Sequence, residues 1–298
     1  MCQRNWRQYN ASLVQRGSLT FFCDPKVVRA LKKAKAPRKG AGRPAYPPQL
    51  ILMLLLLKLT YKLTYRACEG MAHHLFTPHG IQVPSYSTLC RRMRDFVSTL
   101  PSLSKRRPQI VLLDSSGFKV QGEGEWKTKV HGKARRRSWV KVHLVVDSRS
   151  NEIVDVITTP SNVSDAEMGI ALLERMPRSA RSLYADGAYD GEGFRRLSAR
   201  KGIVAVVPPP QHAILRVEGH LAYRNDALRI IKGLGDDLLA RRLWGKLTGY
   251  CHRVKVESAF ARLKKVFGER LFSRRFDALV VEVWMKALLS NIWIKWAS

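Results

Sequence analysis

The chain of 298 residues has few cysteines, few acids and no long apolar segment, and each shortage excludes a class of protein. Its 5 cysteines are scattered and odd in number, and none forms a C-x-x-C pair, which argues against a disulfide framework and a structural zinc site. The longest apolar run, Leu50 to Leu57, is too short to span a bilayer, and the N-terminus lacks a signal-peptide pattern. The sequence therefore predicts a protein of the reducing cytoplasm that has no membrane partner.

The shortage of acids leaves a large positive charge. Asp and Glu total 23 against 53 Lys and Arg, which gives a net charge of +30, far more than solubility requires. Residues 1–108 carry 20 bases and 3 acids (+17), residues 109–210 carry 16 and 12 (+4), and residues 211–298 carry 17 and 8 (+9). The balance favours a nucleic-acid partner, held mainly by the N-terminal third.

The N-terminal region, residues 1–108, is predicted to be helical and to bind DNA. Its third long helix, expected from a cap at Ser85 or Ser87 to about Thr99, is basic. Two helices, a loop and a basic third helix resemble a helix-turn-helix module, although an ordinary helical bundle with solvated arginines would give the same pattern. The expected helices lie at about 49–58 and 62–75, with partly helical structure in 1–34, and the candidate DNA-reading residues are Arg91, Arg92 and Arg94.

A basic linker joins the first helical segment to the rest of this region. Residues 35–48 are rich in basic residues, glycine and proline. Arg43, in the tripeptide G-R-P, fits an arm that follows a DNA groove, and a plain flexible loop explains the same composition equally well.

From residue 109 the pattern changes to that of an α/β domain, 109–298. Three strands, at 110–114, 139–146 and 153–158, predict an antiparallel meander. Alternating helices and strands follow at 165–176, 182–186, 191–201 and 203–207, and a helix at 250–267 ends at Gly268. This order predicts a mixed sheet flanked by helices. Residues 211–249 are poorly patterned and are expected to be an insertion, and a last helix is expected at 278–296.

Three acids stand where a metal site can form. Asp114 and Asp186 each follow a short apolar strand, and Glu257 lies on the helix expected at 250–267. Sites in sheets with parallel strands form beyond the carboxyl ends of those strands. Three carboxylates converging there can hold two divalent cations against a phosphodiester. The sequence therefore predicts a metal site formed by Asp114, Asp186 and Glu257.

The helix that carries Glu257 also carries bases on the same face. At 100° per residue, Tyr250, Arg253, Glu257 and Lys264 fall within about 60° of one another. This mixed edge suits an acid that binds metal and bases that bind phosphate. A row of ordinary surface salt bridges is the alternative interpretation.

Other acids fit a metal site less well. Asp147 ends an antiparallel strand and so emerges at the opposite edge of the sheet, and Asp155 lies within a strand. Asp190 is expected to cap a helix, while Glu123 and Glu125 follow Asp114 in a polar segment and are candidates for outer positions around the site.

Three motifs carry a resemblance to a known family. D-S-S-G-F-K-V at 114–120, A-D-G-A-Y-D at 185–190 and Y-x2-R-x3-E-x6-K at 250–264 resemble the three acidic motifs of DDE transposases from bacterial insertion sequences. N-W-x2-Y-N at 5–10 and G-R-P at 42–44 are similar to the insertion sequence five branch of that family. The resemblance covers nearly the whole chain and is weakest at 211–249.

The resemblance implies a ribonuclease-H-like catalytic core with Asp114, Asp186 and Glu257 as catalytic and metal-binding residues. It implies two Mg²⁺ ions, for which Mn²⁺ would substitute, and action on the terminal inverted repeats of the element. Arg253 and Lys264 are then candidates for binding the flanking phosphates, with Tyr250 stacking or only packing beside them. Trp126, in the segment after the first motif, is a candidate for stacking on a displaced base, or a packed loop aromatic.

The expected activity is cleavage of the element ends and their transfer into target DNA by a homodimer or higher oligomer in the bacterial nucleoid. Two alternatives remain open at this stage. A related structure-specific nuclease would cut without joining strands, and a domesticated DNA-binding protein would do neither.

Overall fold

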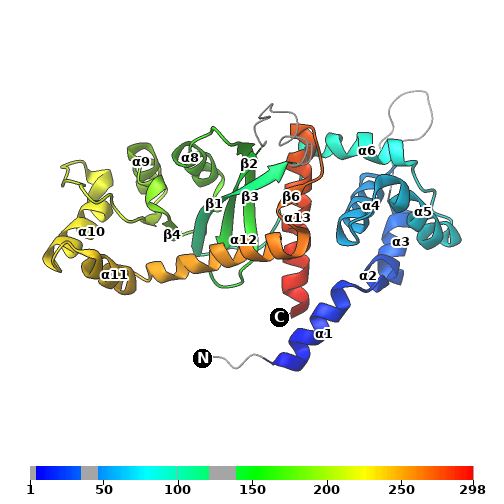
Figure 1. Ribbon diagram of the computed structural model, residues 1–298, viewed down its shortest axis with the longest axis horizontal. Helices are drawn as coiled ribbons and strands as arrows, with labels where there is room; N and C mark the ends of the chain where they lie inside the picture. Colours follow the sequence, from blue (N-terminus) through cyan, green and yellow to red (C-terminus); the bar gives the residue numbers. More distant parts are fainter. Residues whose placement is uncertain (1–4, 35–45, 99, 121–138, 298) are drawn as a thin grey trace, which may run out of the picture. The chain divides into compact units, whose positions relative to one another are not determined.

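The structure is a computed structural model that describes residues 5–34, 46–98, 100–120 and 139–297 (Figure 1). The chain divides into two compact units, residues 1–101 with 275–298 and residues 102–274. The last helix, α13 (Phe276–Ala297), therefore belongs with the N-terminal helices, not with the sheet to which the sequence analysis assigned it. It packs against α1 (Trp6–Arg16), α4 (Pro48–Thr60) and α6 (Tyr86–Asp95). This helix is buried nearly all round, with Leu279, Val281, Val283, Trp284 and Leu289 all covered.

The first unit is helical, as expected. Its third long helix begins where Ser85 accepts a hydrogen bond from the Thr88 N–H at 3.4 Å, so Ser85 and not Ser87 is the cap. That helix ends at Asp95, before the expected Thr99, and a short 3₁₀ turn, η2 (Phe96–Ser98), follows it. This helix is α6 (Tyr86–Asp95). It is preceded by α1 (Trp6–Arg16), α2 (Thr20–Cys23), α3 (Pro25–Lys33), α4 (Pro48–Thr60) and α5 (Tyr65–Phe76).

The second unit is built on one mixed sheet with the strand order β3-β2-β1-β4-β5. β1 pairs antiparallel with β2, which pairs antiparallel with β3, whereas β4 and β5 run parallel to β1. The expected antiparallel meander and the expected mixed sheet flanked by helices are confirmed. The strands are β1 (Ile110–Val120), β2 (Trp139–Asp147), β3 (Ile153–Pro160), β4 (Ser182–Ala185), β5 (Val204–Val206) and a two-residue β6 (Arg270–Leu271), too short to be predicted.

Alternation along β1 decides which helices meet each side chain. Val111 and Leu113 lie in a buried cluster with α8 (Asp165–Arg175) and α9 (Glu192–Arg200). Ser116 and Phe118 instead contact Lys264 of α12 (Val254–Phe267). Because side chains of a strand alternate between faces, Asp114 shares the α12 face. The sheet therefore separates a packed apolar side from the side that carries the first acid.

The poorly patterned segment 211–249 forms two helices, α10 (Ala222–Gly233) and α11 (Leu238–Leu247), seen in yellow and gold in Figure 1. Only a small cluster buries apolar side chains between them, including Ile231 and Trp244. Leu238 is 76 % exposed and Leu247 is 72 % exposed. Helical periodicity is hard to read in this segment because many of its leucines do not face a core.

Candidate active site

The first two acids lie side by side at the edge where β1 and β4 separate. The parallel pairing of these strands ends at Leu113 and Ala185, and Asp114 and Asp186 are the next residues of each strand. β1 itself continues to Val120 in pairing with β2, so Asp114 lies within a strand and does not end one as expected. Asp186 is exposed and accepts a hydrogen bond from the Gly187 N–H at 2.6 Å. The strand order alone thus brings two carboxylates together.

The third acid reaches the same place from α12. The helix expected from 250 begins only at Val254, because residues 250–253 form a 3₁₀ turn, η5 (Tyr250–Arg253). Gly249, at φ 71°, turns the chain into η5 in a conformation that favours glycine. Glu257 lies in the first turn of α12, where a carboxylate is favourable, and its side chain is 49 % exposed.

The electrostatics of Tyr250 show that the three acids are close neighbours. Burial raises the pKa of Tyr250 to about 12. The positive charge of Arg253 opposes this rise, and the negative charges of Asp186, Asp114 and Glu257 add to it. The charges of all three carboxylates therefore reach one phenol, and we call these three acids the acidic centre.

Arg253 bridges two of the acids. Its Nη1 donates to Oδ2 of Asp114 at 3.1 Å, and its Nη2 donates to Oε1 of Glu257 at 2.6 Å. The guanidinium also lies 5.9 Å from the centre of the Tyr250 ring. Burial alone would lower the pKa of Arg253, but the negative charges of its neighbours raise it. The arginine is thus held as a cation within the acidic centre.

The three carboxylates of the acidic centre suit a divalent metal ion chemically, but Arg253 is bound to two of them in this structure. Burial raises the pKa of Asp114, which the Ser115 N–H and Arg253 oppose and the other two acids reinforce, so a further cation would stabilise its carboxylate. Carboxylate oxygens are the ligands that Mg²⁺ prefers. Within the described parts of the chain, no three acidic, histidine or cysteine side chains form a ready ligand cage. Arg253 stands in for a cation between Asp114 and Glu257, and a metal would need it to move.

Lys264 approaches the same face in a different way. Its Nζ donates to the Ser116 hydroxyl at 2.9 Å and lies 5.4 Å from the centre of the Phe118 ring. Ser116 was missed by the sequence analysis, although its position two residues after Asp114 on a strand already predicts a shared face. Tyr250, Arg253, Glu257 and Lys264 thus gather near Asp114 as expected, but from a 3₁₀ turn and a helix together.

The remaining candidate residues lie elsewhere. Arg91 on α6 is exposed, Arg92 is paired with Asp95 at 2.9 Å, and Arg94 is half-buried. These belong to the first unit. Arg43 and Trp126, with Glu123 and Glu125, fall outside the described residues.

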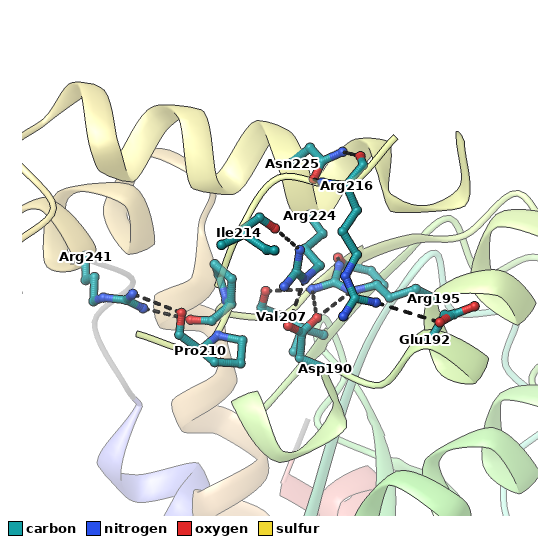
Figure 2. Close-up of polar contacts among 12 residues, drawn as sticks. Asp190, Glu192, Arg195, Val207, Pro210, Ile214, Arg216, Arg224, Asn225 and Arg241 are labelled. Carbon is teal, nitrogen blue, oxygen red and sulfur yellow. Dashed lines mark hydrogen bonds and ion pairs between the residues drawn. The ribbon is translucent and has the colours of Figure 1, made fainter. Parts of the chain in front are cut away.

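Asp190 is the C-terminal cap of the 3₁₀ helix η3 (Gly187–Tyr189), and Gly191 holds the N-terminal cap position of α9. Figure 2 shows its carboxylate between two arginines. Arg195 reaches Oδ1 at 2.7 Å and also donates to the carbonyls of Ala205 and Val207, while Arg224 of α10 reaches Oδ2 at 3.2 Å. This cluster, the Asp190 knot, ties α10 to α9 and β5. No local pattern predicts this cluster, because Arg224 lies 34 residues away from its acid.

Comparison with known proteins assigns the chain to a family. Residues 105–292 match the family described as Transposase DDE domain, and residues 14–123 match a second family of the same description. The first match spans more than half of the chain, so this protein belongs to the DDE transposase family. The structure of the Drosophila P element transposase strand transfer complex is similar over 64 % of this chain and 43 % of that chain, with 16 % identity and a TM-score of 0.31. No helix among the described residues is long and apolar enough to cross a membrane.

Proposed function

We propose that this protein is the DNA transposase of a bacterial insertion sequence of the insertion sequence five branch. It binds the terminal inverted repeats of its element, cleaves the element ends and joins them to target DNA. The observation that supports this most directly is the acidic centre itself: Asp114 and Asp186 directly follow the last paired residues of β1 and β4, and Arg253 joins Asp114 to Glu257. Family membership and a net charge of +30 point to the same substrate, DNA.

In this proposal Asp114, Asp186 and Glu257 hold two Mg²⁺ ions, with Mn²⁺ as a substitute. When bound, the ions activate a water or 3′-hydroxyl as nucleophile and stabilise the leaving oxygen. Arg253 and Lys264 bind the phosphates on either side of the cleaved bond by charge-assisted hydrogen bonds.

The first unit is proposed to recognise the element ends. Residues 1–108 carry +17 of the +30 net charge. Within it, α6 is the candidate reading helix, with Arg91, Arg92 and Arg94 directed at DNA. Arg43 in the basic linker and Trp126 after the first motif complete the proposed DNA contacts. The active form on DNA is proposed to be a homodimer or a higher oligomer, working in the bacterial nucleoid.

The test is a cleavage and strand-transfer assay with duplexes that carry the DNA flanking the coding sequence, with Mg²⁺ and with EDTA. We expect metal-dependent cleavage at the element ends and joined products in wild type. Asp186→Asn and Glu257→Gln should abolish both steps and leave gel-shift affinity largely intact, because each removes an anionic ligand with little change of shape. Cleavage without joining would identify a nuclease, and binding without cleavage would identify a catalytically silent DNA-binding protein.

A further inference from the structure

Arg253 occupies the two carboxylates that the proposed metal site requires. One arm of its guanidinium binds Asp114 on β1, and the other binds Glu257 on α12. The arginine side chain is only 20 % exposed. A paired guanidinium of this kind keeps its fork in a fixed plane, so one residue satisfies two acids at once. Two of the three candidate ligands thus share one cation of the chain itself, which offsets half of their negative charge.

Lys264 provides a contrast on the same helix face. It carries the same charge and also approaches the acidic centre, yet the contacts described for it are with the Ser116 hydroxyl and the Phe118 ring. Both cations raise the local positive potential, but only Arg253 takes up carboxylate oxygens. Comparing Arg253 with Lys264 therefore separates the effect of a nearby positive charge from the effect of a side chain that binds the carboxylate oxygens.

The Asp114 and Glu257 oxygens that accept from Arg253 keep other lone pairs, but the guanidinium charge beside them weakens their attraction for Mg²⁺ and restrains their orientation. Mg²⁺ demands near-octahedral geometry with ligands at about 2.0–2.1 Å, and the guanidinium charge repels it at this distance. A DNA phosphate offers the guanidinium the same two-oxygen geometry as the carboxylates do. Arrival of the phosphodiester would thus compete for Arg253 and release both acids.

We propose that Arg253 is a positioning residue that couples metal binding to DNA binding. In the free protein it holds Asp114 and Glu257 and lowers their affinity for divalent cations. On DNA it transfers to a phosphate beside the cleaved bond, and the two carboxylates become ligands. The inference rests on the proposed function, since it assumes that these acids are the metal site. Its value to a DNA-cutting enzyme is that a fully loaded metal site forms only where DNA is present.

The experiment measures Mn²⁺ affinity of the full chain without DNA, by electron paramagnetic resonance of free Mn²⁺. Arg253→Ala should bind Mn²⁺ more tightly than wild type, by a factor within the range of about 5- to 150-fold typical of coupled sites. Lys264→Ala is the matched control, because it removes the same charge from the same face and should gain less. Equal gains in the two variants, or no gain in Arg253→Ala, would overturn the inference.

The second arm measures the coupling from the DNA side. By linkage, if DNA strengthens Mn²⁺ binding, then Mn²⁺ strengthens DNA binding by the same factor. Anisotropy of a labelled duplex, at matched ionic strength, should show that Mn²⁺ tightens DNA binding in wild type and does so much less in Arg253→Ala. Arg253→Lys keeps the charge without the two-armed fork and should fall between them, which also serves if the alanine variant folds poorly.

Asp114→Asn separates failure of this inference from failure of the proposed function. Loss of Mn²⁺ binding in Asp114→Asn establishes that the acidic centre holds metal. If Asp114→Asn loses Mn²⁺ while Arg253→Ala gains nothing, only the coupling is wrong. If Asp114→Asn binds Mn²⁺ as wild type does, the metal site itself is elsewhere and both proposals fall.

Discussion

Two clusters of acids and arginines lie in the second unit, and they differ mainly in how much water reaches them. In the Asp190 knot, the side chains of Asp190 and Arg195 are 2 % and 3 % exposed, and both carboxylate oxygens already have arginine partners. In the acidic centre, Asp114 is 17 % exposed and Glu257 is 49 % exposed, and Asp186 is also exposed. Asp186 and Asp190 stand four residues apart in one motif, yet belong to different clusters.

Exposure and the partners of the carboxylate distinguish a structural acid from a functional one. A buried carboxylate whose partners also bind backbone carbonyls cannot exchange those partners without unfolding the local structure, as in the knot shown in Figure 2. A carboxylate that water reaches, and that a single arginine holds, can exchange that arginine for a metal or a substrate. The substitutions of Asp114 and Asp190 described next test this distinction.

The largest effect is expected for activity when Asp114 becomes Asn. Cleavage should fall by more than about 1,000-fold, equivalent to roughly 4 kcal/mol of barrier. The free energy of unfolding should stay within about 1 kcal/mol of wild type, because burial already raises the pKa of Asp114 and the neutral amide avoids that cost. Cleavage rate and urea unfolding should be measured on the same preparations. Loss of stability in proportion to activity would place Asp114 with the structural acids.

Asp190→Asn should give the opposite result. Removing the charge leaves Arg195 and Arg224 without their shared anion, and breaking a buried ion pair typically costs about 3–5 kcal/mol. Urea unfolding should show this loss, while cleavage per folded molecule should be largely retained. Asp226→Asn is the control, since its pair with Arg229 is exposed and should contribute less than about 1 kcal/mol. A stable Asp190→Asn variant without activity would move Asp190 into the functional cluster.

The sequence predicted one of these clusters and not the other, for a physical reason. Asp114 and Asp186 each follow a short apolar run in the sequence, so local pattern and the parallel pairing of β1 with β4 suffice to bring them together. The Asp190 knot depends on Arg224, which only the folded chain brings near. The same limit explains the errors in the fold. The strand expected at 110–114 runs on to Val120, because pairing with β2 keeps Ser115 to Lys119 extended. Helix α13 is buried nearly all round, so its sequence pattern gives no sign of which unit it joins.

His143 sharpens the comparison, because it is a buried titratable group on the other face of the sheet. Its Nε2 lies 3.1 Å from the Thr159 hydroxyl, and its Nδ1 lies 3.6 Å from Asp165. Burial lowers its pKa to about 4, although the negative charge of Asp165 opposes the shift and Lys141 adds to it. The neutral form is therefore the folded form. Its stabilisation is fully present above the ordinary pKa of about 6.5 and is lost as pH falls toward 4.

We expect His143→Gln to flatten the loss of stability between pH 6.5 and 4, a loss of at most about 3 kcal/mol in wild type. Urea unfolding at several pH values measures it, and the difference between variant and wild type cancels the contribution of the carboxyl groups. His212→Gln, at an exposed position, should leave the profile unchanged. An unchanged slope in His143→Gln would show that this histidine does not titrate with unfolding.

The smallest effect is expected on α6, where the first unit offers an exposed arginine beside a paired one. Arg91 is exposed, whereas Arg92 is held by Asp95 at 2.9 Å. Arg91→Ala should weaken binding to element-end DNA by about 1–3 kcal/mol if it reads a base, and Arg92→Ala should cost less. The full chain must be used, because α13 packs against α6 and a fragment ending at residue 108 would lack it. Anisotropy with element-end and unrelated duplexes, at several salt concentrations, separates the roles. Equal loss on both duplexes with a shallower salt dependence would make Arg91 a phosphate contact, and an equal loss in both variants would show that pairing with Asp95 does not set Arg92 apart.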